Sequence, residues 1–438
     1  MKQLQPRSTL AHEKHERQTQ STSVSFSSFA IGMLVASLIA GCASEPPQET
    51  AVASPPAAPK PVTVTAAVAP APVGPLPFDR AIEAAANVLF TKAGVTTPRV
   101  IVIDPLIDGL TGEQTIASRQ IEKRFREIAG QFPAFEIRDF TSENVAQNPT
   151  VLVGTFTGVP PDGAPLGKPS AYRICLALAD LETGKIVATG VSRATLDGVD
   201  VTRTPYYADS PVWVKDEAVD AYIKTCQGIA IGDPISTGYR QSLSNASTIV
   251  DAINAYDQKN YVQARELYLK ALNTPPGNQL RVHAGLYMTN LKLGKRADAE
   301  QAFGKVVDAG LSSNRLAVKF LFQPGRTEFW SDTNVSGVYP LWLRQIAGRV
   351  SKLDRCLNIV GHTSRTGNDA TNDKLSLARA DAIKRRLQSV TPALAGKTST
   401  AGMGSRENLV GSGTDDVGDL ADRRVEFKVA ACGSKQKT

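Results

Sequence analysis

Residues between positions 361 and 379 carry the side chains needed to bind an acid group. Residues 361–367 read Gly-His-Thr-Ser-Arg-Thr-Gly, a turn with a glycine at each end and small polar groups between them. Asn372, Ser376 and Arg379 follow at spacings that place them on one face of a helix. A guanidinium group holds a carboxylate through two parallel hydrogen bonds. We therefore predict a pocket beneath this turn, in which Arg379 binds a carboxylate.

The strands and helices that would position this pocket are visible in the apolar pattern. Apolar runs at 320–322, 357–361 and 424–429 are typical of strands, and a helix is expected between the first two. Asn372 is a favourable N-cap for the helix that carries Arg379. The apolar stripe of that helix is predicted to consist of Leu375, Ala378, Ala382 and Leu387.

These residues resemble the peptidoglycan-binding domain of the OmpA/Pal/MotB type. The matching pieces, in order, are Gly361-His362-Thr363, Gly367, Asn372, Leu375-Ser376, Arg379-Ala380, Gly402-Met403-Gly404-Ser405 and Arg423-Arg424-Val425-Glu426. The resemblance implies a βαβαβ fold with a mixed sheet over residues 316–432, and the diaminopimelate of the peptidoglycan stem peptide as ligand. It also implies that Arg379 holds the carboxylate of this ligand. The other pocket residues that it implies are Thr363, Ser364, Asn372, Leu375 and one of Arg423 or Arg424.

Three positions depart from the family pattern. Ser364 stands where the family usually has the aspartate that holds the ammonium group of diaminopimelate. Gln323 replaces a common acidic residue, and Asp422 replaces the usual asparagine. A neutral hydrogen bond stabilises by about 1 kcal/mol, against about 1.5–3 kcal/mol for a charge-assisted one. Several alternatives therefore stay open. The pocket binds the ligand weakly, uses Asp369 or Asp422 in place of the missing aspartate, or prefers an altered stem peptide. In the last alternative the ligand is lost and Arg379 forms a salt bridge inside the domain.

The residues that precede Cys42 have the order of a secretory signal peptide. Basic residues precede an apolar run at 30–38, and the small residues Ala40 and Gly41 come directly before the cysteine. This order resembles the bacterial lipobox, which implies cleavage after residue 41 and acylation of Cys42. Ala43 stands where an aspartate would suggest retention in the inner membrane, so an outer-membrane lipoprotein facing the periplasm is expected. An ordinary cleaved signal with an incidental cysteine is the alternative.

Residues 42–77 are rich in Ala, Val and Pro. Proline at this density disfavours helix and sheet and favours an extended, polyproline-like chain. At about 3.1 Å per residue, such a linker reaches on the order of 100 Å. It would carry a folded body away from the membrane, although simple disorder without such a role is the other interpretation.

Four further cysteines remain, and an exported chain lies where disulfides persist. Position along the chain favours the pairs Cys175–Cys226 and Cys356–Cys432, with four free buried cysteines as the alternative. No pair of cysteines has CxxC spacing, and the four histidines are scattered, so neither a redox motif nor a metal site is predicted.

Residues 78–240 predict an α+β domain. A helix is expected from Phe78, strands at 99–105, 135–140, 150–159 and 171–179, and a hairpin through Glu182-Thr183-Gly184. Asp104-Pro105 followed by residues 111–115 resembles, weakly, the periplasmic domain of FlgO-type and penicillin-binding-protein-activator lipoproteins, which are binding modules. Asp104 and Glu113 as paired catalytic carboxylates are the alternative. We favour turn and capping roles for them, since these residue types are common there.

Residues 245–312 predict a short helical segment. Ala264 and Ala299 lie nearly one tetratricopeptide period apart, and Tyr268 and Phe303 follow them at the same spacing. The segment therefore resembles two degenerate tetratricopeptide repeats, which usually need a third for stability. A helical connector packed on a neighbour is an equally good interpretation.

Together these features predict a multidomain α+β envelope protein that is not an enzyme. The chain has 438 residues and a net charge of +7, which falls to near +5 once residues 1–41 are removed. That surplus does not indicate nucleic-acid binding, and no catalytic or cofactor motif is present. The expected function is to tether the outer membrane to peptidoglycan. The alternative is an adaptor that binds a partner protein, such as a peptidoglycan synthase or a secretion or motility component, through residues 78–310.

Overall fold

The computed structural model describes residues 74–94, 98–161, 168–411, 413 and 418–433. The predicted signal peptide, Cys42 and the linker up to residue 73 lie outside these residues. Within them, no helix combines the length and the apolar character needed to cross a membrane.

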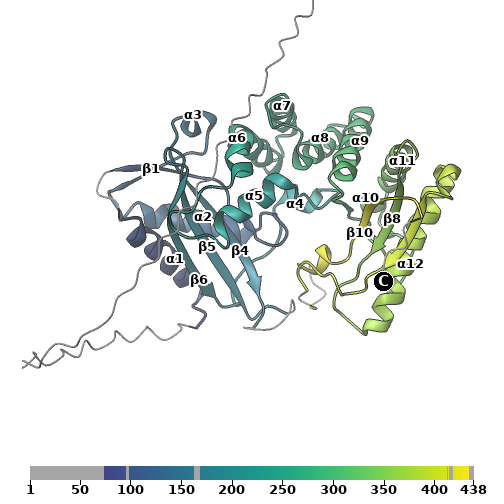
Figure 1. Cartoon of the computed structure of the whole chain (residues 1–438), viewed down its shortest axis with the longest axis horizontal. Coiled ribbons are helices and arrows are strands. Elements are labelled where there is room, and N and C mark those ends of the chain that lie inside the picture. Colours follow the sequence, from purple (N-terminus) through teal and green to yellow (C-terminus); the bar gives the residue numbers. More distant parts are fainter. Residues whose placement is uncertain (1–73, 95–97, 162–167, 412, 414–417, 434–438) are drawn as a thin grey trace, which may run out of the picture. The chain divides into compact units, whose positions relative to one another are not determined.

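A mixed sheet forms the centre of the N-terminal part (Figure 1). Its strands are β1 (Arg99–Ile103), β2 (Ile107–Asp108), β3 (Phe135–Arg138), β4 (Thr150–Val159), β5 (Ala171–Asp180) and β6 (Lys185–Ala194). They lie in the order β3-β1-β4-β5-β6, with β2 pairing alongside β4. The pairs on the β3 side of β4 are parallel, while β4, β5 and β6 are antiparallel. The predicted hairpin at Gly184 is confirmed as the β5–β6 turn.

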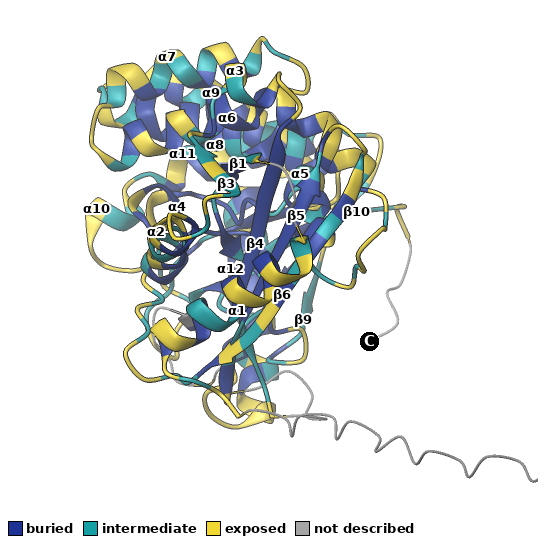
Figure 2. Ribbon diagram, turned by 90° about the vertical axis from the view of Figure 1, so that its left-hand side faces the viewer, coloured by how far each residue is buried: buried dark blue, intermediate teal, exposed yellow. Residues whose placement is uncertain are grey.

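Helices cover both faces of this sheet. α1 (Phe78–Ala93) and α2 (Ile116–Ala129) pack on one face, and α5 (Glu217–Cys226) and the first half of α6 (Thr237–Asp257) pack on the other. The short α3 (Ser142–Val145) lies on the α6 side. Because side chains alternate along a strand, β4 gives Leu152 to the first layer and Val153 to the second. β4 is accordingly buried along most of its length (Figure 2).

The helical segment continues from α6 through three further helices. These are α7 (Tyr261–Leu272), α8 (Leu280–Lys292) and α9 (Arg296–Ser312), each packed on the one before it. Ala264 and Ala299 are fully buried, as are Tyr268 and Phe303. The short α4 (Pro205–Asp209) packs against the same helices through Tyr206.

The C-terminal part is a four-stranded mixed sheet with two long helices, as predicted. Its elements are β7 (Leu316–Val318), α10 (Thr333–Ser336), α11 (Tyr339–Val350), β8 (Cys356–Gly361), α12 (Asp369–Val390), β9 (Thr398–Gly402) and β10 (Val425–Ala430). Two 3-10 turns lie at Pro392–Leu394 and Gly418–Ala421. The strand order is β7-β10-β8-β9, with β10 antiparallel to both neighbours and β8 parallel to β9.

Two local predictions in this part are wrong. The first strand is Leu316–Val318 rather than 320–322, because Leu316 and Val318 pair with β10 while Phe322 only bridges to Phe329. The long helix begins earlier than predicted, and its N-cap is Asn368 rather than Asn372. Asn368 Oδ1 accepts a hydrogen bond from the backbone N–H of Ala370 at 2.8 Å, so Asn372 lies inside the first turns of α12.

The helical segment and the C-terminal sheet share one hydrophobic core. Trp342 of α11 stacks on Phe303 of α9 with ring centroids 5.5 Å apart. Its indole N–H donates to the hydroxyl of Tyr287 in α8 at 2.6 Å. The shared core extends from Tyr206 in α4 to Phe427 in β10, so these elements pack as one body.

Candidate ligand site in the C-terminal domain

The long helix α12 lies unusually close to the ends of β8 and β9. Gly361 and Gly402 are paired across these two strands. A Cβ atom on Gly361 would lie 2.1 Å from the backbone oxygen of Ser376, and one on Gly402 would lie 2.7 Å from the Ser376 hydroxyl. The two glycines therefore allow α12 to approach the sheet at Ser376. Arg379 lies one turn further along the same buried face.

Arg379 is buried without an acidic partner. Its Nε donates to the backbone oxygen of Arg326 at 3.1 Å, and its Nη2 donates to that of Gln323 at 3.3 Å. The guanidinium carbon lies 5.0 Å from the centre of the Phe322 ring. Among the described residues no carboxylate pairs with Arg379, so the internal salt bridge that was an alternative does not form there. Burial, together with the nearby Arg423, lowers the pKa of Arg379 to about 10, and the group stays charged at neutral pH.

A small cavity of about 30 Å³ lies next to this guanidinium. It is lined by Phe320, Leu321, Phe322, His362, Arg379, Arg423 and Arg424. Both ring nitrogens of His362, the hydroxyl of Thr363 and Nη1 of Arg424 are buried without a hydrogen-bond partner in the described structure. Buried polar groups are normally paired, so this concentration of unpaired groups beside a cavity indicates a ligand site.

The charges around the cavity favour an anion. Arg424 Nε donates to Glu426 at 2.7 Å, and although burial opposes it, Arg424 holds the pKa of Glu426 to about 2. Burial and the neighbouring Arg424 lower the pKa of His362 to about 3, so its imidazole is neutral at physiological pH. Arg379, Arg423 and Arg424 line the cavity. Glu426 pairs with Arg424, and no carboxylate among the described residues pairs with Arg379.

The structure brings together some of the predicted site residues and leaves others apart. Arg379, Arg423 and Arg424 line the cavity, and Thr363 and Ser364 are buried in the adjoining turn. Asn372 lies on the same buried helix face, where its side-chain amide donates to the backbone oxygen of Thr366 at 3.2 Å. Leu375 is only half-buried and does not line the cavity.

Asp369 and Asp422, the two carboxylates that could replace the missing aspartate, contact other groups. Asp422 is fully buried and accepts hydrogen bonds from the backbone N–H groups of Leu409, Val410 and Gly411 at 2.5, 3.0 and 2.7 Å. Asp369 accepts a hydrogen bond from the hydroxyl of Ser405 at 3.3 Å on the surface. Asp422 therefore holds a loop, and neither carboxylate lines the cavity.

Sequence reasoning missed the backbone and aromatic partners of Arg379. The carbonyl groups of residues 323 and 326 come from a loop without apolar periodicity, and although the family pattern draws attention to position 323, it does not indicate that these backbone oxygens contact Arg379. Phe322 had a usable signal, since an aromatic residue in an apolar run can stack on a guanidinium, but it was assigned to a strand. His362 was placed in the turn but not among the ligand-binding residues.

Asp104 and Glu113 do not form a catalytic pair in the structure. Asp104 accepts a hydrogen bond from the hydroxyl of Tyr239 at 2.7 Å, and burial raises the pKa of its carboxyl group to about 6. Glu113 contacts Arg203 at 2.6 Å and Lys319 at 3.3 Å. The capping role predicted for Glu113 is wrong, because the N-cap of α2 is Thr115, in a capping box with Ser118.

The four cysteines lie as two neighbouring pairs. Cys356 and Cys432 form a disulfide between the start of β8 and the residues after β10. Cys175 and Cys226 are free and buried, with their sulfur atoms 2.7 Å apart. The second predicted disulfide therefore stays a prediction, with its partners already adjacent.

Comparisons with known proteins found solved structures that resemble about a quarter of the chain. No curated protein matches the chain. The periplasmic domain of Helicobacter pylori MotB is 18% identical over 26% of this chain and 74% of its own, with a TM-score of 0.23. The peptidoglycan-associated lipoprotein from Burkholderia pseudomallei is 23% identical over 26% of this chain and 88% of its own, with a TM-score of 0.22. The cell wall anchor of the T6SS from Pseudomonas aeruginosa is 24% identical over 26% of this chain and 80% of its own, also with a TM-score of 0.22.

A match to a family model covers part of the candidate site, although Phe320, Arg423 and Arg424 lie outside the matched range. Residues 321–419 match the OmpA family, and this range includes the turn with Thr363 and Ser364, the helix α12 and Arg379. The C-terminal part of this chain is therefore an OmpA family domain.

Proposed function

We propose that the C-terminal domain binds peptidoglycan without covalent attachment, and that a carboxylate of the stem peptide contacts Arg379. The observation that carries this proposal is the buried guanidinium of Arg379, which has no acidic partner among the described residues. A carboxylate ligand would complete the hydrogen bonds of Arg379 and neutralise its charge. The unpaired hydroxyl of Thr363 and the His362 ring offer further contacts.

The affinity of this site is expected to be modest. Diaminopimelate carries an ammonium group, and Ser364 supplies only a neutral hydroxyl to it. Replacing a charge-assisted hydrogen bond by a neutral one costs about 1 kcal/mol. A tethered site compensates for weak affinity, because attachment at a second point raises its effective concentration.

The second attachment point is proposed to be Cys42. Acyl chains on this residue would hold the outer membrane, and residues 42–77 would place the folded body in the periplasm. The OmpA family domain would then hold the cell wall, so that the protein connects the two layers. Binding and tethering require no catalytic step, and none is proposed.

Arg379→Ala tests the pocket, with Arg386→Ala as its matched control. Both arginines lie on α12, stack on a phenylalanine and donate to backbone oxygens of residues 323–327, but only Arg379 lines the cavity. We expect the mature chain carrying Cys42→Ala to sediment with purified sacculi. Arg379→Ala should reduce retention at least tenfold, while Arg386→Ala should retain it. Equal retention of wild type and Arg379→Ala would remove this pocket from the proposal.

Ser364→Asp tests whether the missing negative charge at this position limits the affinity for the ligand. A carboxylate at this position would pair with the ammonium group of the ligand, so retention on sacculi should increase severalfold. An unchanged or weakened retention would show that the ligand presents no ammonium group to Ser364.

A further inference from the structure

The unpaired groups around the Arg379 cavity indicate which ligand chemistry would complete it. In the described structure, Nη1 of Arg424, both ring nitrogens of His362 and the hydroxyl of Thr363 have no hydrogen-bond partner. The guanidinium nitrogen can only donate, whereas a neutral imidazole and a hydroxyl can each donate and accept. All three side chains are buried, and those of Arg424 and His362 line the cavity. A matching ligand must therefore bring hydrogen-bond acceptors as well as a donor.

None of the described residues that line this cavity is acidic. The two carboxylate oxygens of Glu426, which lies next to it, pair with Arg424 and Lys428, each at 2.7 Å. Glu407 lies 4.0 Å from a ring nitrogen of His362, but its side chain is 55% exposed and does not line the cavity. An ammonium group in the cavity would therefore find no carboxylate in the lining to pair with.

The nitrogen beside a carboxylate differs in these properties between a free and an acylated amino acid. A free amino group is an ammonium at neutral pH, which offers donors and no acceptor. An acylated nitrogen belongs to a neutral amide, which offers one N–H donor and a carbonyl acceptor. With the carboxylate on Arg379, the amide carbonyl would accept from Nη1 of Arg424 and the amide N–H would donate to the Thr363 hydroxyl. An ammonium group would leave Nη1 of Arg424 unpaired.

We propose that the Arg379 cavity binds a carboxylate whose neighbouring nitrogen is acylated, in preference to a free amino acid end. The proposal rests on the proposed peptidoglycan function and names the part of the stem peptide that is bound. A stem peptide carries such a group at its γ-linked glutamate, at a terminal D-alanine, and at a diaminopimelate whose side-chain amine is cross-linked. An uncross-linked diaminopimelate instead carries a carboxylate beside a free amine.

The test compares diaminopimelate with its N,N′-diacetyl derivative. Both are titrated by calorimetry into the mature chain carrying Cys42→Ala. We expect the diacetyl derivative to bind at least tenfold more tightly. Equal affinities, tighter binding of free diaminopimelate, or no binding of either probe would overturn the proposal.

Three acetylated probes distinguish the possible sources of the group. N-acetyl-D-glutamine represents the γ-linked glutamate, N-acetyl-D-alanine represents the terminal alanine, and the diacetyl derivative represents the cross-linked diaminopimelate. The probe that binds most tightly identifies the source. The proposal requires that this probe bind at least tenfold more tightly than the same amino acid without its acetyl group, and a smaller difference would contradict it.

Variants around the cavity locate the preference. Arg379→Ala should lose binding of the diacetyl derivative. Ser364→Asp adds a carboxylate in the adjoining turn and should strengthen binding of free diaminopimelate at least fivefold, and since sacculi contain both forms of this residue, it also gains retention there. Ser389→Asp is the control, because Ser389 is exposed in the last turn of α12, and it should leave both affinities unchanged. Tight binding of free diaminopimelate that is lost in Glu407→Gln would show that Glu407 holds an ammonium group, and would overturn the proposal.

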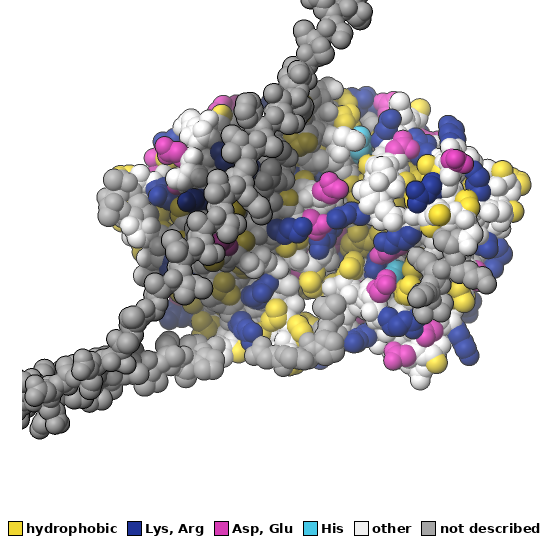
Figure 3. Space-filling model, in the orientation of Figure 1, with side chains coloured by type: hydrophobic (Ala, Val, Ile, Leu, Met, Phe, Trp, Pro, Cys, Tyr) yellow, Lys and Arg dark blue, Asp and Glu magenta, His cyan; other side chains and the backbone are white. Residues whose placement is uncertain are grey.

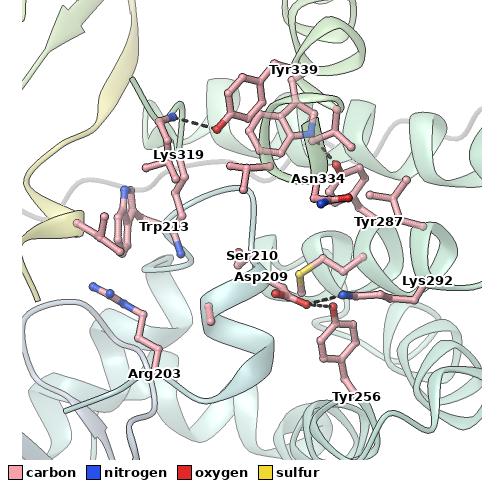
Figure 4. A pocket seen from close by; sticks show the side chains of 18 of the residues that line it. Arg203, Asp209, Ser210, Trp213, Tyr256, Tyr287, Lys292, Lys319, Asn334 and Tyr339 are labelled. Atoms are coloured by element: carbon pink, nitrogen blue, oxygen red, sulfur yellow. Dashed lines mark hydrogen bonds and ion pairs between the residues drawn. The ribbon is translucent and has the colours of Figure 1, made fainter. Parts of the chain in front are cut away.

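A larger cavity offers the probes a second place to bind. Its volume is about 420 Å³, and its walls come from residues 202–213, from α6 and α8, and from the stretch between β7 and α11 (Figure 4). Leu291→Phe narrows that cavity and should leave binding of the diacetyl derivative unchanged. Loss of binding in Leu291→Phe, together with full binding by Arg379→Ala, would place the probe in the larger cavity and contradict the assignment.

Sedimentation with sacculi separates failure of this proposal from failure of the peptidoglycan function. Retention that depends on Arg379, combined with equal binding of the two diaminopimelate probes, would overturn the proposal and leave the function standing. Absence of retention, combined with an Arg379-dependent preference for the diacetyl derivative, would overturn the function and leave the assigned ligand class standing.

Discussion

Two arginines on α12 show how burial and neighbours separate the proposed ligand-binding residue, Arg379, from a structural one, Arg386. Arg379 and Arg386 both stack on phenylalanines, at 5.0 and 4.3 Å. Only Arg379 lies beside a cavity with unpaired donors. The guanidinium of Arg386 donates to the backbone oxygen of Ala382 in its own helix and to that of Thr327. Arg386 does not line this cavity.

The charge of the pocket predicts how wall binding depends on pH. The pKa of His362 is lowered to about 3 and that of Arg379 only to about 10, so neither group changes charge between pH 5 and pH 8. An ordinary carboxylate of the ligand is also ionised throughout this range. Retention on sacculi should therefore be constant from pH 5 to pH 8, measured by sedimentation at fixed ionic strength. A step near pH 6.5 would mean that His362 titrates in the pocket.

The free cysteines allow a direct chemical test. Because the sulfur atoms of Cys175 and Cys226 are 2.7 Å apart, we expect them to form a disulfide once the chain is exported. Protein isolated from the envelope should then leave both residues unlabelled by iodoacetamide in denaturant without reductant, as read by peptide mass spectrometry. Cys226→Ser is the control and should expose Cys175 to labelling. Labelled Cys175 in the wild type would contradict this expectation.

Residue types were predictable from the sequence, whereas their partners were not. Arg379 could be identified from its helical spacing with Asn372 and Ser376. Its contacts with the backbone oxygens of Gln323 and Arg326 depend on the path of a loop, which residue spacing does not encode. The same holds for Asp422, which the sequence offers as a ligand and the structure uses to bind three backbone N–H groups.

Among the secondary-structure elements, the contact of α12 with β8 and β9 is the one that sets the pocket geometry. Gly361 and Gly402 bring the helix so close that a side chain on either strand would meet its backbone or the Ser376 hydroxyl. The strands β8 and β10 were predictable from their apolar runs. The first strand was misplaced because Phe320, Leu321 and Phe322 are apolar for another reason: Phe320 packs in the core, and Phe322 stacks under Arg379.

Gly361→Ala should disturb this contact. Its Cβ would lie 2.1 Å from the Ser376 backbone oxygen, and such overpacking typically destabilises by about 1–3 kcal/mol. We expect a lower urea midpoint together with reduced retention on sacculi, because α12 carries Arg379. Gly396→Ala is the control, since a Cβ there meets nothing within 4 Å. A Gly361→Ala protein with unchanged retention would show that the pocket tolerates movement of α12.

For the whole molecule, the main finding is that the predicted units are not independent of one another. Val212 and Trp213 follow the N-terminal sheet in sequence. Even so, Val212 forms a β-bridge with Val318, and the backbone N–H of Trp213 donates to the backbone oxygen of Ala317 at 3.2 Å. Figure 3 shows basic and acidic side chains interspersed on the face drawn, without one dominant patch. The succession of an α+β part, a helical segment and a mixed sheet could be read from apolar patterns. The shared core could not, because those patterns do not state which buried faces meet.

Glu113 connects the N-terminal part to the residues next to β7. Its carboxylate contacts Arg203 and Lys319, and its own side chain is 2% exposed. Glu113→Ala removes a buried carboxylate that contacts both Arg203 and Lys319, which should lower the free energy of unfolding by about 3 kcal/mol, measured by urea denaturation. Glu136→Ala removes the exposed pair with Arg138 and should change it by less than about 1 kcal/mol. Equal effects of the two variants would mean that the Glu113 contacts do not hold the parts together.

The shared core also determines how this protein would respond to mechanical load. In a tether, the wall pulls on α12 while the membrane pulls on the opposite end of the chain. The pull would cross β7, which pairs with β10 and is joined by Val212, and would spread through apolar packing from Tyr206 to Phe427. Stretching would then have to occur outside this block, so the connection would remain stiff at the end that meets the wall.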